Sequence, residues 1–258
     1  MNPKQAYQDG DLSQAMTLAA EAVKQNPSDV TARVFFAELC CIVGDLERAD
    51  KQLQTLITLA PELVLTASNW RQLIRAAYAR NSVYQEGATP TLVAPPSPDV
   101  ERALHQLVAL HNNFLETETT DSDENSSPAN VVFTVNQSST AALRDLDDLN
   151  AHILEFLGTN GNYFWVELSQ IESLHLETPE RPLDLLWRKC RLITNGGSDG
   201  VVFMPTIYPN TSDDTQQLLG RSTDWVNRNG LELGLGLREF LVGDEVLSIM
   251  DLKSLVRA

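Results

Sequence analysis

Three aspartates in the second half of the chain, Asp145, Asp147 and Asp148, have the spacing that comes nearest to acid–base chemistry. Two carboxyl groups that face one another can divide the roles of general acid and general base. Such a site needs a second carboxylate opposite the cluster, and Asp184 and Asp224 are the candidates. The same aspartates would also stabilise the first turn of a helix, where the dipole favours negative charge. A hydrolase or another enzyme with a carboxylate site in the C-terminal domain is therefore the alternative function.

The remaining catalytic patterns lack the context that their chemistry needs. Ser198 lies between small residues, like a hydrolase nucleophile, but the run VVFMP after it predicts a strand where that motif requires a helix. Gly234 and Gly236 lack the third glycine of a nucleotide-binding loop. The histidines have neither the spacing nor the cysteine neighbours of a zinc site. We therefore predict no catalytic residue, no metal and no cofactor.

The charge and the cysteine content exclude several classes of function. The net charge of −16 argues against binding to nucleic acid or to an anionic membrane, because both present negative charge. The first residues contain no secretory signal, and no stretch of about 20 apolar residues could span a bilayer. Three cysteines, two of them adjacent, do not make a disulfide framework. The sequence predicts a cytoplasmic protein, and its acidic surplus leaves open a scaffold that binds a basic partner.

An internal repeat indicates how the first half is built. The segment GDLSQAMTLAAEAVKQNP (10–27) returns as GDLERADKQLQTLITLAP (44–61), and matching residues lie 34 positions apart. The matches are Gly10 and Gly44, Asp11 and Asp45, Leu12 and Leu46, Ala15 and Ala49, and Pro27 and Pro61. This period is that of the tetratricopeptide helix–turn–helix, a unit that buries its apolar face only by stacking on its neighbours. Stacked helical hairpins leave a groove that usually holds a peptide or a helix.

Residues 3–8 have the look of the remnant of a first helix. The spacing of apolar residues then predicts five helices in the first half, over 11–25, 30–43, 46–60, 63–80 and 99–115. A proline-rich connection, 81–98, separates the last two. The helix over 30–43 is apolar almost all round, so it is either covered on every side or forms one wall of a groove. In repeat geometry the first helix of each hairpin lines the concave side. This geometry predicts the partner-binding residues Val34, Glu38, Cys41, Arg71 and Arg75.

Arg71, Arg75 and Arg80 lie on one predicted helix of an acidic protein. Three guanidinium groups in a row could clamp the carboxylates of a partner. They could equally pair with the chain's own aspartates and glutamates, or lie in solvent. The sequence alone favours the internal or solvated arrangement.

The second half has the pattern of an α+β domain. Strands are predicted at 131–135 and 163–168, and NGGSDG predicts a hairpin between RKCRLIT and VVFMPTIY. Residues 144–158 predict a helix that ends at Gly158, and 177–187 predict a short helix. Several short strands with turns between them predict a small, twisted, barrel-like antiparallel sheet.

These patterns divide the chain into three parts and give the fold class α+β. Residues 1–115 form a tetratricopeptide-like α-α helical domain. Residues 116–140 form a polar linker followed by the first strand, and 141–258 form the α+β domain. The segment 116–130, ETETTDSDENSSPAN, is acidic and nearly without apolar residues, which predicts a mobile linker.

The order of several segments resembles the ImpE family, also called TagJ or SciE. The segments are GDLERADKQL, LIRAAYAR, RDLDDL with ILEFL, YFWVEL, RPLDLLW, LGRSTDW and GLGLREFLVGDE. Each segment alone is weak evidence for the family. Their joint order is specific, and it covers nearly the whole chain outside 116–140. The chain departs from the family pattern in its polar 116–130 segment and at Leu237, where a polar residue is expected.

The resemblance implies an accessory protein of the bacterial type VI secretion system, without enzymatic activity. Family members are linked to the contractile sheath through the N-terminal helix of its small subunit, and to sheath recycling by the associated unfoldase. It carries no catalytic motif and no residue-level binding map to this chain. Combined with the repeat, it leads us to expect a non-catalytic adaptor that binds a helix of a sheath subunit in the groove of the helical domain.

Overall fold

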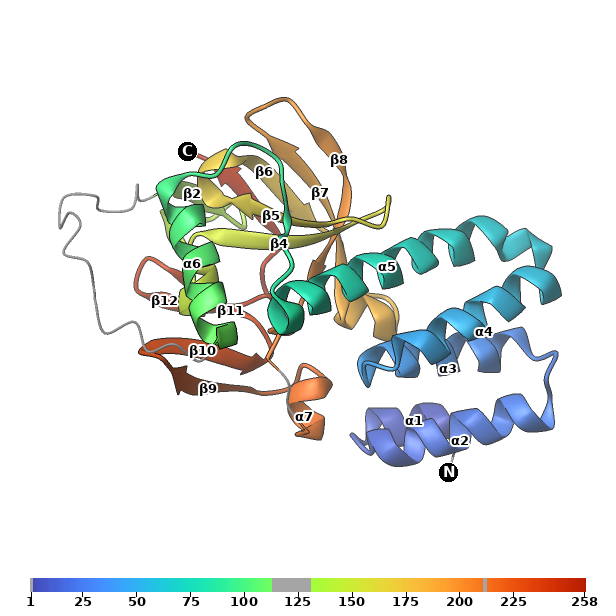
Figure 1. Cartoon of the computed structure of the whole chain (residues 1–258). Coiled ribbons are helices and arrows are strands. Elements are labelled where there is room, and N and C mark those ends of the chain that lie inside the picture. The colour runs from blue at the N-terminus through green and yellow to red at the C-terminus, as the bar shows by residue number, and fades with distance from the viewer. Residues whose placement is uncertain (1, 113–130, 211–212) are drawn as a thin grey trace.

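The computed structural model describes residues 2–112, 131–210 and 213–258 of the 258-residue chain. The described helices are α1 (Pro3–Gln8), α2 (Leu12–Gln25), α3 (Val30–Ile42), α4 (Leu46–Leu59), α5 (Val64–Glu86), α6 (Pro98–Asn112) and α7 (Thr215–Leu218). Short 3-10 helices are η1 (Pro61–Leu63), η2 (Asp148–Asn150), η3 (Leu168–Gln170) and η4 (Pro182–Leu185). Figure 1 shows α1 to α4 stacked at one end of the molecule, with α5 running from this stack toward the strands. The α+β class predicted from the sequence is confirmed.

The five helices predicted in the first half are confirmed as α2 to α6, and the largest difference is at the end of α5. This helix continues to Glu86, six residues beyond the predicted end at 80. No proline occurs in these residues to interrupt the helix. Val83 lies in the core, and its burial stabilises the additional turns. It ends where Gly87 adopts the left-handed conformation, with φ of 73°.

The two copies of the repeat have the same local structure. Gly10 and Gly44 both have positive φ, 86° and 79°, at the turn before a helix. The next residue in each copy, Asp11 or Asp45, is the N-cap whose carboxylate accepts a hydrogen bond from the backbone N–H three residues later. The sequence match therefore reflects a shared turn-and-cap geometry.

The strands of the second half form one large sheet and one hairpin. The strands are β1 (Thr91–Leu92), β2 (Val132–Val135), β3 (Ser139–Asp145), β4 (Ile153–Gly158), β5 (Tyr163–Glu167), β6 (Ile171–Leu176), β7 (Trp187–Thr194), β8 (Asp199–Pro205), β9 (Thr223–Arg228), β10 (Leu231–Gly236), β11 (Glu239–Val242), β12 (Glu245–Ser248) and β13 (Ser254–Arg257). The large sheet has 11 strands in the order β1-β5-β4-β8-β7-β6-β13-β2-β3-β11-β12, and β9 pairs with β10. The predicted strands near 131–135 and 163–168 and the β7–β8 hairpin are confirmed.

The described sheet is not closed, so the barrel-like form expected from the sequence is not confirmed. Its order begins at β1 and finishes at β12, and no pairing between these two strands joins the ends within the described residues. Apart from the short β1–β5 contact, which is parallel, neighbouring strands are antiparallel.

The helix predicted over 144–158 is wrong. Strand β3 ends at Asp145, η2 spans Asp148–Asn150, and the remaining residues form β4. The apolar residues of this stretch satisfy a helical period, but every residue of β4 is buried, as in a strand covered on both faces. The short helix predicted over 177–187 is reduced to η4.

The helices and the sheet share a hydrophobic core. One cluster of buried residues joins Leu73 and Trp70 of α5 to Ile153, Trp165 and Leu157 of the sheet. A second cluster, which includes Phe133, Phe156 and Phe240, lies within the strand region. The linker predicted over 116–130 lies outside the described residues, whereas β2 and β3 already belong to the large sheet.

Candidate functional site

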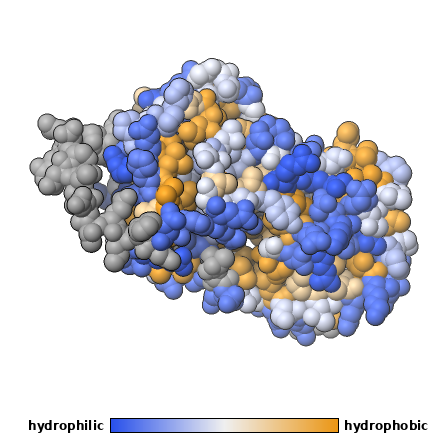
Figure 2. Space-filling model, viewed as in Figure 1, coloured by the Kyte–Doolittle hydropathy of each residue, from blue (hydrophilic) through white to orange (hydrophobic). Residues whose placement is uncertain are grey.

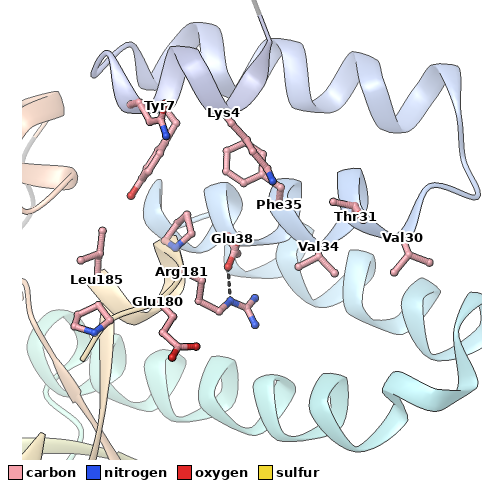
Figure 3. A pocket seen from close by; sticks show the side chains of 13 residues that line it. Lys4, Tyr7, Val30, Thr31, Val34, Phe35, Glu38, Glu180, Arg181 and Leu185 are labelled. Carbon is pink, nitrogen blue, oxygen red and sulfur yellow. Dashed lines mark hydrogen bonds and ion pairs between the residues drawn. The ribbon is translucent and has the colours of Figure 1, made fainter. Parts of the chain in front are cut away.

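An open cleft of about 550 Å³ lies between the first helices and the segment that carries η4. Helix α1 contributes Tyr7 and α3 contributes Val34 and Phe35, while Pro182 and Leu185 belong to the opposite side. Figure 3 shows these side chains around the cleft, which the residues from 179 to 185 border on one side. Figure 2 shows hydrophobic residues gathered on the surface of the amino-terminal helices. The cleft thus combines an apolar lining with walls from two distant parts of the sequence.

The composition of α3 explains why an apolar lining faces this cleft. Asp29 caps the helix by accepting a hydrogen bond from the Ala32 backbone N–H at 2.9 Å. Leu39 and Cys40 are wholly buried against the neighbouring helices. Val30 and Val34, one helical turn apart, are only partly buried and line the cleft. One stripe of this almost uniformly apolar helix is therefore covered only in part by the rest of the protein.

The ion pair between Glu38 and Arg181 joins the two walls of the cleft. Arg181, just before η4, donates from Nε to Oε1 of Glu38 on α3 at 2.5 Å. The Arg181 guanidinium also stacks on the Trp70 ring, 4.8 Å from its centroid. Burial raises the pKa of Glu38, and the partly opposing effect of Arg181 does not reverse that shift. The pair fixes the η4 segment against α3.

The structure separates the five partner-binding residues predicted from the sequence. Val34 and Glu38 line the cleft, whereas Cys41, one turn further along α3, is buried inside the helical core. Arg71 and Arg75 line another hollow, of about 400 Å³, beside α4 and α5. The α3 residues and the α5 arginines thus lie on different surfaces.

The three arginines of α5 have different surroundings. Arg71 donates to both carboxylate oxygens of Asp50, at 2.6 and 3.0 Å. The Arg80 side chain is largely buried and pairs with the carboxylate of Glu155. Arg75 is exposed, makes no ion pair within the described residues, and packs its aliphatic stem beside Gly161 of the β4–β5 hairpin. Two of the three arginines therefore pair internally, as the sequence favoured.

The sequence predicted a short helix near α1 and another near residues 179–185, but assigned neither segment to the groove. Helix α1 confirms the short helix expected over 3–8, but six residues are too few for an apolar period that would show which face lines a groove. The second wall is recognisable only as PERPLDL, a proline-braced turn, and its contact with α3 joins positions 143 residues apart. No local pattern could have paired these segments.

A buried network of four charged side chains lies where α5 meets the sheet; we call Arg80, Glu155, Arg238 and Asp145 the junction network. Glu155 accepts from Arg80 at 2.8 Å and also pairs with Arg238. Arg238 donates to Asp145 at 2.9 Å, and both side chains are fully buried. Two cations thus face two anions in the interior, which is the condition under which charges are tolerated there.

Three tyrosine hydroxyls donate hydrogen bonds to the carboxylates of the junction network. The hydroxyls of Tyr84 and Tyr163 donate to Glu155, and that of Tyr208 donates to Asp145. Burial by itself would raise the pKa of Glu155, but Arg80 and Arg238 hold it at about 2. Burial raises the pKa of Asp145 to about 7 despite its pairing with Arg238. Glu155 thus joins α5 to the sheet through Arg80 and Tyr84, whereas Asp145 contacts Arg238 and Tyr208.

The four carboxylates of the alternative enzyme site have separate local contacts. Asp145 belongs to the junction network, while Asp148 pairs with Arg144 at 2.8 Å. Asp184 accepts from the Glu180 and Arg181 backbone N–H groups, and the exposed Asp224 accepts from the Trp225 N–H. The cleft and the α4–α5 hollow are lined by none of the four.

Among residues 2–112, 131–210 and 213–258, no three His, Cys, Asp or Glu side chains are grouped so that they could hold a metal ion. Within the same ranges, no helix has both the length and the apolar character needed to cross a membrane.

Comparisons with known proteins agree with one another. The ImpE protein family model matches residues 137–256. The chain is 26% identical over 250 residues to the type VI secretion system accessory component TagJ of Pseudomonas aeruginosa, which covers 95% of this chain and 87% of TagJ. The crystal structure of protein VPA1032 from Vibrio parahaemolyticus superimposes with a TM-score of 0.86 at 32% identity, covering 99% of this chain and 97% of that one. That protein therefore shares the arrangement of helices and sheet described above.

Proposed function

This chain belongs to the ImpE/TagJ family, and from that premise we propose that it is a non-catalytic adaptor of the type VI secretion system. Its similarity to TagJ supports the role of an accessory protein of that system. In this proposal the cleft between α1, α3 and residues 179–185 binds an amphipathic helix, the N-terminal helix of the small sheath subunit. The protein would act in the cytoplasm, in sheath assembly or in recycling by the associated unfoldase.

The observation that carries this proposal is the apolar stripe on α3, Val30 and Val34, that the protein covers only in part. Helix-in-groove recognition needs an apolar channel whose edges are polar, so that anchors of the bound helix are buried while its other face stays in water. The cleft has this composition, with Val30, Val34 and Phe35 in its lining and charged side chains beside them. Its volume of about 550 Å³ has room for several anchoring side chains.

We also propose that α1 to α5 are tetratricopeptide-like helical hairpins. The 34-residue spacing and the equivalent turns at Gly10 and Gly44 support this arrangement. In such a stack α1 and α3 would be the first helices of successive hairpins, and both line the cleft. The concave side of the repeat and the cleft would then be one surface.

The test is a binding titration with a synthetic peptide of the sheath subunit's N-terminal helix. Val34→Asp places a charge in the lining of the cleft and should weaken binding at least tenfold, because an apolar anchor would face a carboxylate. Arg75→Glu is the matched control, since it changes charge on the α4–α5 hollow. It should change the affinity less than twofold.

Circular dichroism and thermal unfolding of both variants show whether they remain folded. If folded Val34→Asp binds the peptide as tightly as the unmodified protein, the cleft is not the binding site. If Arg75→Glu alone loses binding, the α4–α5 hollow is the site instead. Absence of saturable binding to the unmodified protein would reject the sheath helix as the partner.

A further inference from the structure

Among the described residues, four charged side chains line the cleft, and they divide into one ion pair and two single charges. Glu38 and Arg181 neutralise one another across the cleft. Lys4 on α1 and Glu180 on the opposite segment are exposed, and neither side chain makes an ion pair or hydrogen bond within the described residues. Two free charges of opposite sign therefore remain at this site.

These two charges belong to opposite rims of the cleft. Figure 3 shows Lys4 reaching from α1 toward Phe35, whereas Glu180 extends from the segment that also carries Arg181. The apolar residues of α3, Val30 and Val34, lie in the lining to which both rims belong. A helix lying along this apolar stripe would have one flank against a positive rim and the other against a negative rim.

We propose that the cleft is electrostatically polarised and selects an amphipathic helix with acidic side chains along one flank of its apolar face and basic side chains along the other. The acidic flank faces Lys4 and the basic flank faces Glu180. Reversing the direction of a helix exchanges its two flanks, so the rims also determine the direction in which the helix binds. This inference rests on the proposed function, because it concerns the occupant of the same cleft.

The charges at the rims should change the affinity for the helix only modestly. Exposed ion pairs contribute little affinity each, while a like charge brought opposite a rim residue is repelled. The apolar lining therefore supplies most of the affinity, and the rims supply specificity and direction. Each single rim reversal should weaken binding about three- to fivefold, an effect that shrinks at high salt.

The experiment is a fluorescence anisotropy titration with two peptides. The first is the N-terminal helix of the small sheath subunit, and the second has the acidic and basic flank residues of that helix exchanged. The proteins are the unmodified chain, Lys4→Glu, Glu180→Lys and the double variant. Lys24→Glu and Glu172→Lys make the same charge changes at exposed positions that do not line the cleft.

We expect both single rim variants to bind the first peptide about three- to fivefold more weakly, and both controls to bind within twofold of the unmodified chain. The double variant should prefer the exchanged peptide, which the unmodified chain should disfavour. Rim variants that behave like their controls, or a double variant that keeps the original preference, would overturn the inference.

Measuring the Val34→Asp variant in the same titration distinguishes a failure of this inference from a failure of the proposed function. If Val34→Asp abolishes binding while the rim variants have no effect, the cleft binds the helix and only the polarised rim is wrong. If the unmodified chain binds neither peptide, the proposed function and the inference both fail.

Discussion

The cleft and the junction network use the same kinds of side chain in opposite ways. In the junction network, Arg238 and Asp145 are wholly buried and each charge has an opposite partner. At the cleft, Lys4 and Glu180 are exposed and have no partner within the described residues. Buried charges that are paired fix one geometry, whereas unpaired charges at a rim are available to another molecule.

The shape of the cleft depends on the junction network. One wall of the cleft comes from the stacked helices and the other from η4, which precedes strand β7 of the sheet. Arg80 and Tyr84 of α5 bind Glu155 of β4, and this contact anchors the helices on the sheet. The spacing of the two walls therefore depends on contacts that are not themselves part of the cleft.

The largest expected effect is on stability, at the centre of the junction network. Glu155→Gln removes the carboxylate that Arg80 and Arg238 share and leaves two buried cations with one anion, so it should cost about 3–5 kcal/mol. Urea unfolding followed by circular dichroism measures this change. Asp199→Asn breaks the exposed Arg191 pair and should leave the midpoint nearly unchanged. Equal midpoints for the two variants would contradict the structural role of the network.

Acid pH should reduce the difference in the free energy of unfolding between the unmodified chain and Glu155→Gln. The pKa of Glu155 is held at about 2, below its ordinary 4.5, so its charge stabilises the fold above pH 4.5 and this contribution disappears as pH falls toward 2. The shift corresponds to about 3 kcal/mol. Asp145, with its pKa raised to about 7, acts in the opposite direction between pH 4 and 7, where rising pH costs stability.

Unfolding curves of the unmodified chain and of Glu155→Gln, measured from pH 6 to pH 3, isolate the Glu155 contribution as their difference. The gap between the two proteins should narrow steadily below pH 4.5. A gap that stays constant or widens on acidification would show that Glu155 is not held ionised by the two arginines.

A smaller effect is expected at the ion pair that joins the cleft walls. Arg181→Gln leaves Glu38 buried without its cation, which should cost about 1–3 kcal/mol and loosen residues 179–185. Hydrogen–deuterium exchange should then be faster in this segment, while α5 near Arg80 keeps its protection. Unchanged exchange over 179–185 would mean that the pair does not hold this wall.

The smallest effect is expected at the α4–α5 hollow. Arg71→Lys replaces the two-point contact with Asp50 by a single one on a half-exposed surface, so it should change stability by less than about 1 kcal/mol. Peptide binding to the cleft should be unaltered. A loss of binding comparable with that of Val34→Asp would move the functional surface from the cleft to this hollow.

Local patterns predicted the local structure, and failed where distant contacts decide. The turn glycines and aspartate caps act within one helical turn, so the 34-residue match located α2 and α4 correctly. The stretch 144–158 carries a helical apolar period, but burial on both faces makes Ile153–Gly158 a strand. Val34 and Glu38 were assigned to a groove that the structure places beside them, while Arg71 and Arg75 lie elsewhere. The contact of Arg181 with Glu38 depends on the tertiary fold, and no spacing encodes it.

The most direct test is site-specific photo-crosslinking in cells that assemble the secretion system. A benzoylphenylalanine at Thr31, an exposed residue that lines the cleft, is compared with one at Tyr78, which lines the α4–α5 hollow. Adducts are identified by mass spectrometry of the cross-linked peptides. We predict adducts between position 31 and the N-terminal helix of the small sheath subunit, and none from position 78. Adducts to that helix from position 78 alone, or from neither position, would contradict the assignment of the cleft.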